Sequence, residues 1–369
     1  MKIDRVSLHH LRMRLRAPFE TSFGKTLDRE CILLEVYSEG LVGYGECVAD
    51  QDPGYSYETV QTAWHILRDF LVPVVLGVDI PDPEEFHRRA AHVRGHSMAK
   101  AGLELALWDL LGKRQERSLQ ALLGGRAAQV AVGVSVGIQP SPAQLIEVVG
   151  DYVDQGYRRI KIKIKPGRDV AEALAVRHAF PNHLLQVDAN SAYSLETARV
   201  LRPLDELNLL LIEQPLSEDD MWDHSRLQAE FRTPICLDES ILSVRHARQA
   251  LEMGACRVIN IKPGRVGGVT EALAIHDLCM AQNVPVWCGG MLETGVGRAS
   301  NLALASLPGF TLPGDISASD RYYAEDITHQ RFVLNPDSTI NVPQGNGLGV
   351  TIDDAALQRA ALDHLVLKS

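Results

Sequence analysis

Five charged residues recur at nearly constant spacing in the second half of this chain, each following a short apolar run. The steps between them are 25, 25, 25 and 24 residues, and the residues are Lys163, Asp188, Glu213, Asp238 and Lys262. One strand, one helix and their connections fill such a step, which is the repeat of an α/β barrel. Equal steps place the side chains at one height, at the carboxyl ends of successive strands, where barrel enzymes keep their active sites.

Eight apolar runs separated by helix-sized gaps indicate the strands of this barrel. They span 132–136, 160–164, 184–187, 209–212, 235–237, 258–261, 284–287 and 310–312. Repeated strand–helix units force parallel strands, and buried parallel strands are apolar throughout. We therefore expect an α/β fold with a closed barrel over residues 126–328.

The first 125 residues have a different character. Stretches 2–15 and 31–47 are rich in β-formers, and leucines recur at helical spacing over 55–115. This order predicts an α+β unit. Segment 329–369 carries two prolines and three glycines between 336 and 349, should end in a short helical tail, and is expected to fold back onto that unit.

Composition excludes some functions. The net charge of −10 argues against nucleic-acid binding, which needs a basic face. No stretch approaches the ~20 apolar residues of a membrane span, and the N-terminus lacks the apolar core of a signal peptide. Six cysteines form no CxxC pair, which suits buried thiols in a reducing compartment. We expect a cytoplasmic protein that binds neither membrane nor nucleic acid.

Three of the five recurring residues are carboxylates, and such crowding requires a neutralising charge. Hard oxygen ligands suit Mg²⁺, with Mn²⁺ as a substitute, and the absence of His and Cys from the set argues against zinc. A metal held by Asp188, Glu213 and Asp238 could bind a substrate carboxylate. It would then stabilise the enediolate left when the neighbouring carbon loses a proton.

The lysines flank these carboxylates and are candidate acid/base groups. An isolated lysine, with a pKa of ~10.4, is too basic for this work at neutral pH, so its pKa must be lowered by a nearby cation or desolvation. Lys161, Lys163 and Lys165 share one strand face, so we expect them to lower one another's pKa. The 25-residue step favours Lys163 as the base, although spacing alone leaves the assignment open, and Lys161 could reach a substrate carboxylate.

Further residues near the predicted strand ends are candidates for contact with substrate or ligands. A single Asp or Asn at such a position is more often a helix N-cap, and a glycine there is often a plain turn. Gly264–Gly268 resembles a phosphate loop only weakly, because no Gly-Lys-Ser/Thr follows. The candidates beside substrate are Ser135, Gly290, Met291 and Asp315, and those supporting the metal ligands are Asn190 and Glu239.

These residues resemble the enolase superfamily, in its branch of o-succinylbenzoate synthases and N-acylamino-acid racemases, over essentially the whole chain. The segments that carry the resemblance are 18–24, 161–163, 187–190, 212–215, 236–240, 260–268 and 287–293. It implies a modified (β/α)₇β barrel under an α+β capping domain, formed by 1–125 and completed by 329–369. Superfamily sites pair Lys or His bases with Mg²⁺.

The resemblance also implies roles for individual residues. Asp188, Glu213 and Asp238 would bind Mg²⁺, Lys163 and Lys262 would be the acid/base pair, and the loop around Phe19–Phe23 would close over a small carboxylate substrate. Related barrels often assemble, so a homo-oligomer is expected. Lys165 adds a third lysine beside the pair, which could shift the pH optimum.

Two reactions fit this branch. The first hypothesis is an o-succinylbenzoate synthase, a lyase of menaquinone biosynthesis that eliminates water from a cyclohexadiene carboxylate. The alternative is an N-succinylamino-acid racemase, with both activities conceivable in one site. Two other readings are a metal-free Schiff-base enzyme with a nucleophilic lysine and a non-catalytic barrel.

Overall fold

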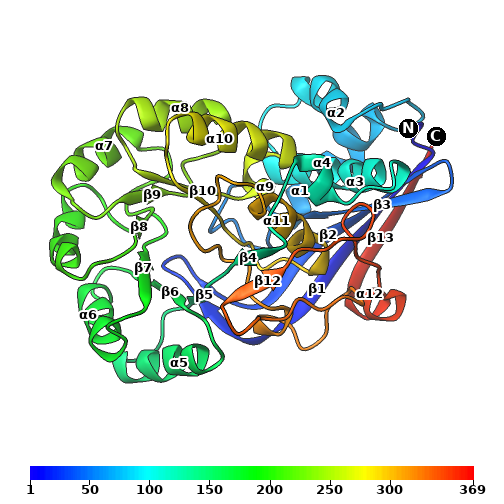
Figure 1. The fold of residues 1–369 in the computed structure, drawn as a ribbon. Helices are drawn as coiled ribbons and strands as arrows, with labels where there is room; N and C mark the ends of the chain where they lie inside the picture. Colours follow the sequence, from blue (N-terminus) through cyan, green and yellow to red (C-terminus); the bar gives the residue numbers. More distant parts are fainter.

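A four-stranded antiparallel sheet lies at one side of the molecule and contains both ends of the chain (Figure 1). The computed structural model describes all 369 residues. The sheet order is β13-β1-β2-β3, with bounds β1 (Arg5–Glu20), β2 (Lys25–Ser38), β3 (Leu41–Cys47) and β13 (Ala361–Lys368). Glu39 and Gly40 in the β2–β3 turn both have positive φ, as tight hairpin turns require.

Helices follow β3 in the chain, and the longest of them packs on the sheet. They are α1 (Val60–Ile66), the π-helical turn η1 (Leu67–Leu71), η2 (Val72–Val74), α2 (Pro83–Arg89), η3 (Ala90–His92), α3 (Ser97–Arg114) and α4 (Leu119–Leu123). α3 lies directly against β3. The approach is so close that a Cβ on Gly45 would be only 2.0 Å from the carbonyl oxygen of Gly102, so only glycine fits there. A core of 26 buried apolar residues fills this part of the protein.

Seven parallel strands form the barrel sheet, in the order β11-β10-β9-β8-β7-β6-β5. They are β5 (Val134–Val136), β6 (Arg159–Lys163), β7 (Leu184–Asp188), β8 (Ile212–Glu213), β9 (Ile235–Leu237), β10 (Val258–Ile261) and β11 (Val286–Cys288). Helices surround them: α5 (Pro142–Asp154), α6 (Val170–Ala179), η4 (Thr197–Glu206), α7 (Met221–Glu230), α8 (Val244–Glu252), α9 (Pro263–Val266), α10 (Val269–Ala281) and α11 (Gly295–Ala305). The fold is the modified barrel with an α+β part that the sequence predicts.

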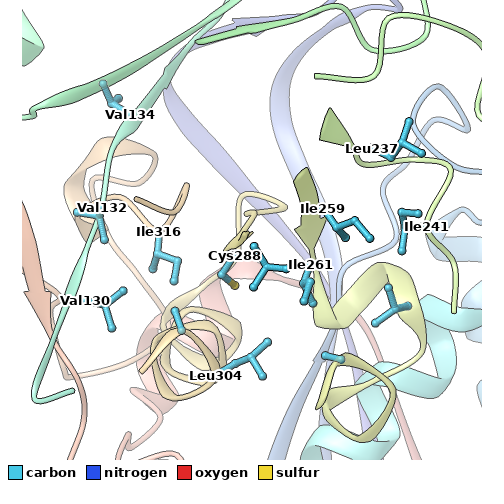
Figure 2. Packing of buried hydrophobic residues seen from close by; sticks show 14 of the residues in the cluster. Val130, Val132, Val134, Leu237, Ile241, Ile259, Ile261, Cys288, Leu304 and Ile316 are labelled. Carbon is cyan, nitrogen blue, oxygen red and sulfur yellow. The ribbon is translucent and has the colours of Figure 1, made fainter. Parts of the chain in front are cut away.

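The eighth apolar run, 310–312, is not a regular strand. Phe310 forms a parallel bridge with Val286, and Gly314 forms one with Val132, so this segment closes the ring between β11 and the start of β5. Pro313 has no N–H to donate, which interrupts a continuous ladder. The amide of Gly133 still donates to the carbonyl of Gly314 at 2.8 Å. Buried side chains from both sides of this closure pack together, including Val132, Cys288 and Ile316 (Figure 2).

The predicted helical tail is wrong in its last part. The short helix α12 (Asp354–Ala360) is followed by β13, which pairs antiparallel with β1 from Arg5↔Lys368 to Leu11↔Ala361. β4 (Gln129–Ala131) and β12 (Thr339–Asn341) form a separate two-stranded sheet, and η5 (Ser319–Arg321) precedes β12. None of the helices has both the length and the apolar composition to cross a bilayer. The division into residues 1–125, 126–328 and 329–369 stays a prediction.

Candidate active site

Strand register brings the recurring charged residues to one end of the barrel. Lys163 and Asp188 are direct partners across β6 and β7, and Asp188 and Glu213 are direct partners across β7 and β8. Glu213 pairs with Cys236, so Asp238, directly after β9, lies two residues above the level of Glu213 and points to the same face. The expected single height is therefore wrong at this strand pair. Lys262 immediately follows β10. The 25-residue step therefore corresponds to a row of side chains across five adjacent strands.

Each of the three carboxylates is bound by a lysine ammonium. Nζ of Lys163 donates to Oδ2 of Asp188 at 2.6 Å, and Nζ of Lys262 donates to Oδ2 of Asp238 at 2.7 Å. Nζ of Lys161 donates to Oε2 of Glu213 at 2.9 Å and lies 3.3 Å from Oδ2 of Asp188. The carboxylates are fully buried, whereas the lysines reach the cavity above them.

A cavity of about 390 Å³ lies over these strand ends, between the barrel and the antiparallel sheet. Lys163 and Lys262 line it, as does Asn190. So do all the residues predicted to contact substrate: Phe19, Phe23, Ser135, Lys161, Gly290, Met291 and Asp315. Their roles toward a ligand stay predictions, but the structure gathers them around one space.

The segment around Phe19–Phe23 lines this cavity. β1 continues to Glu20, further than the sequence indicates, and the connection to β2 is only residues 21–24. The hydroxyl of Ser22 donates to the carbonyl of Asn190 at 3.0 Å, and Nζ of Lys165 lies 3.2 Å from Oε1 of Glu20. Two contacts therefore fasten this segment to the barrel, and Lys165 serves one of them.

Asp315 is held by two cations at the edge of the cavity. Its Oδ2 contacts the ammonium of Lys161, and its Oδ1 lies 2.7 Å from the guanidinium of the fully buried Arg159. The Lys161 ammonium also lies 4.9 Å from the ring centroid of Trp287, a favourable cation–π distance. In this arrangement Asp315 fixes the position of Lys161.

The predicted supporting residues connect neighbouring strand ends. Asn190 has a positive φ of 42°; its Oδ1 accepts from Lys163 at 2.9 Å, and its Nδ2 donates to Oε1 of Glu239 at 2.8 Å. Oε2 of Glu239 is buried without a partner, and so is the hydroxyl of Ser135. Asn190 is thus a site residue rather than a helix cap.

Burial and charge set the protonation of the carboxyl groups. Burial and the neighbouring Asp188 raise the pKa of Glu213 to about 8. Burial and Asp238 likewise raise the pKa of Glu239 to about 8. Burial alone would raise the pKa of Asp238, but Lys262 and Arg265 hold it well below its usual value. The carboxyl groups therefore compete for the available cations.

The expected mutual lowering of pKa within the Lys-x-Lys segment is wrong for Lys161. Burial lowers the pKa of Lys161, but the carboxylates of Asp315, Glu213 and Asp188 outweigh it and raise the pKa well above the usual value. Three opposite charges surround this ammonium, whereas Lys163 and Lys165 are occupied by their own acidic partners. Sequence spacing shows the neighbouring lysines but not the carboxylates packed against them.

Four residues of the site were missed from the sequence, the half-buried Tyr55 and three buried residues. The hydroxyl of Tyr55 donates to Oδ1 of Asp238 at 3.0 Å and accepts from Nζ of Lys262 at 3.1 Å. Arg265 pairs with the same Oδ1, and Nδ2 of Asn260 donates to Glu213 at 2.9 Å. Arg159 is the fourth. Strand alternation could have found two of them, because Arg159 and Asn260 lie two residues before Lys161 and Lys262.

The donor set is chemically suited to a divalent cation. It consists of buried carboxylates on adjacent strands, without His or Cys. Burial is the main cause of the raised pKa of Glu213, and repulsion from the carboxylate of Asp188 is the second. One cation, the Lys161 ammonium, already contacts both Asp188 and Glu213. As arranged, however, no three acidic, His or Cys side chains are placed to share an ion. Their role as metal ligands therefore stays a prediction.

Comparison with known proteins finds relatives that match nearly the whole chain. Residues 144–356 match the family model described as enolase C-terminal domain-like, and residues 3–124 match the mandelate racemase / muconate lactonizing enzyme N-terminal domain. The o-succinylbenzoate synthase of Geobacillus stearothermophilus is 52% identical over 97% of this chain and 96% of that protein. The N-succinylamino acid racemase of Thermus thermophilus is 49% identical over 98% of each chain.

A solved structure agrees with this result. An enolase-superfamily member from Listeria innocua superposes with a TM-score of 0.95 at 42% identity, over 100% of this chain and 99% of the other.

Proposed function

Because this chain belongs to the enolase superfamily, we propose that it is a magnesium-dependent dehydratase that forms o-succinylbenzoate in menaquinone biosynthesis. Close relatives with that name support the proposal at 46–52% identity. The substrate is a small cyclohexadiene carboxylate with a hydroxyl group on the carbon next to its acidic C–H.

One observation carries the chemistry: Lys163 and Lys262 line the same cavity from opposite sides. β6 and β10 are four positions apart in a ring of seven strands and one closing segment, so their ends face one another across the barrel. A substrate held at the centre therefore has one amine on each face. The cavity volume of about 390 Å³ suits a small carboxylate.

Asp188, Glu213 and Asp238 would hold the Mg²⁺ ion once their oxygens turn from the lysines to the metal. A divalent cation there would offset the negative charge that develops on the substrate carboxylate as the proton leaves. Mn²⁺ should substitute, because it accepts the same oxygen ligands.

The chain's own residues perform the proton transfers. Lys163, as a free amine, takes the α-proton, and the C–H electron pair passes into the carboxylate to give an enediolate. Collapse of the enediolate forms the new C=C bond and breaks the adjacent C–O bond. The Lys163 ammonium returns its proton to the departing hydroxide, which leaves as water. Protonated Lys262 stabilises the enediolate from the other face.

Racemisation of N-succinylamino acids is the second candidate function. The same pair of opposed lysines favours it, because each amine faces one side of the α-carbon, and a relative with 49% identity bears that name. In this reaction one lysine removes the proton and the other returns a proton to the opposite face.

Rates on the dehydratase substrate and on N-succinylamino acids, measured side by side, test the proposal. Dehydration should be the faster reaction, and its absence would overturn the proposal. Isotope exchange in heavy water tests the racemase alternative: Lys262→Ala should exchange the α-proton of one enantiomer only. Exchange of both enantiomers would contradict the two-base assignment. Sedimentation velocity tests the expected homo-oligomer.

A further inference from the structure

A second cavity of about 370 Å³ adjoins the substrate cavity at Tyr55. The two cavities share Gly54, Tyr55, Ser56, Glu58 and Asn190 in their walls, but lysines line only the substrate cavity. The second cavity is lined by Glu58, Glu218 and Glu239, with Arg265 as its one cationic residue. Arg265 is already neutralised by Asp238, so this space has an acidic character.

This second cavity reaches the buried carboxylates. Tyr55 and Arg265 both line it and both contact Asp238. Asn190 also lines it, and its backbone amide donates to Oδ1 of Asp188 at 3.0 Å. The cavity therefore ends one side chain away from two of the three proposed metal ligands.

Two buried polar atoms in the wall of the second cavity have no partner. They are Oε2 of Glu239 and the hydroxyl oxygen of Ser191. Glu239 is only 6% exposed. Leaving a buried polar group unpartnered is unfavourable, so such atoms usually meet a ligand or water during function. Glu218 lies at the exposed end of the same cavity.

The substrate cavity offers a cation a less favourable approach. Lys161, Lys163 and Lys262 line that cavity, and each donates to one of the three carboxylates beneath. A divalent cation arriving from that side must first pass three ammonium groups. Carboxylates also line that cavity, but the three ammonium groups lie directly over the proposed ligands. From the second cavity the cation meets carboxylate and hydroxyl oxygens, and the one cationic group there, Arg265, is already paired with Asp238.

We infer that the second cavity is the path by which a hydrated divalent cation reaches and leaves the carboxylate cluster, with Glu239 as a transient oxygen ligand. The inference rests on the proposed metal site and adds a separate route for the metal, distinct from the route of the substrate. Substrate then stays bound in its own cavity while the metal exchanges through the second one.

Manganese exchange kinetics test this path without reference to catalysis. Association of Mn²⁺ is followed by water-proton relaxation in a stopped-flow mixer, and dissociation by mixing the loaded protein with excess EDTA. Glu239→Gln retains an acceptor for Asn190 but places an amide nitrogen where the unpartnered oxygen lies. Glu218→Gln removes the charge at the exposed end. Each should slow both association and dissociation at least about threefold, with Kd changed by less than twofold.

A steric variant and a matched control make the test specific. Leu242→Trp, which narrows the second cavity only, should slow exchange in both directions without altering Kd. Asp52→Asn removes an exposed carboxylate from the substrate cavity only and should leave both rates unchanged. Circular dichroism verifies the fold of each variant.

The outcomes separate the inference from the proposed function. If wild-type protein binds no Mn²⁺, the proposed metal site is wrong. If Mn²⁺ binds but Glu239→Gln and Leu242→Trp exchange it at wild-type rates, the path is wrong and the metal site stands. If Glu239→Gln weakens Kd by accelerating release, Glu239 is a resident ligand, and this also overturns the path.

Discussion

The ammonium of Lys163 lies 2.6 Å from Oδ2 of Asp188, its direct neighbour across the pairing of β6 with β7. The proposed base thus donates a hydrogen bond to a proposed metal ligand. Lys262 makes the same contact with Asp238 at 2.7 Å. Occupation of the carboxylates by a metal would release the amines toward substrate. Acid/base chemistry and metal binding are therefore coupled through shared oxygens.

Lys163→Ala should reduce kcat for dehydration by about 10²–10⁴-fold, because it removes the group that takes and returns the proton. Steady-state kinetics with saturating Mg²⁺ measure the effect. Lys165→Ala is the matched control, since Lys165 contacts only Glu20 at the rim and should keep kcat within a few-fold. Equal losses in both variants would contradict the assignment of Lys163.

Removal of divalent cations should abolish turnover, and added Mg²⁺ should restore it. Mg²⁺ should also raise Tm, because a ligand at about 100 times its Kd stabilises the folded state by ~2.7 kcal/mol. Calorimetry with and without Mg²⁺ measures this shift, and Asp188→Asn should remove it. Full activity after exhaustive EDTA treatment would favour the metal-free Schiff-base reading.

Asp315→Asn should destabilise the protein by about 3–5 kcal/mol, because it leaves the buried cations Lys161 and Arg159 without their shared carboxylate. Urea unfolding monitored by tryptophan fluorescence measures the change. Glu206→Gln breaks the exposed pair with Arg232 and should have no measurable effect. A wild-type midpoint for Asp315→Asn would show that Asp315 is not required to hold these cations.

Glu46 should make stability depend on pH between about 4.5 and 7. It accepts from the amides of Thr294 and Gly297 at the start of α11, yet burial raises its pKa to about 7. A folded pKa above the unfolded value gives stability that is present below pH 4.5 and is lost as pH rises through 7. The loss should be roughly 1–3 kcal/mol.

Chemical unfolding at a series of pH values tests this dependence. Glu46→Gln should flatten the curve over that range, since the amide does not titrate. An unchanged slope in Glu46→Gln would assign the pH dependence to other groups.

The sequence by itself determined the barrel and the row of charged residues. A constant step along βα repeats brings the side chains to neighbouring strand ends, because each repeat has nearly the same length. The expected single height is wrong at one strand pair, since Asp238 lies two residues past Cys236, the register partner of Glu213. For the same reason the spacing alone was enough to identify Lys163, Asp188, Glu213, Asp238 and Lys262 as one row. The prediction of a helical tail is wrong for Ala361–Lys368, because the pairing of β13 with β1 joins residues at least 350 positions apart.

Only the tertiary structure decided what each charge touches. Tyr55 contacts Lys262 although the two residues are 207 positions apart in the sequence. Asp315 and Arg159 form an ion pair across the closure of the barrel. These contacts depend on how separate elements pack, which no local spacing encodes. They also set the direction of each pKa shift, so the high pKa of Lys161 follows from its three-dimensional surroundings rather than from its neighbours in sequence.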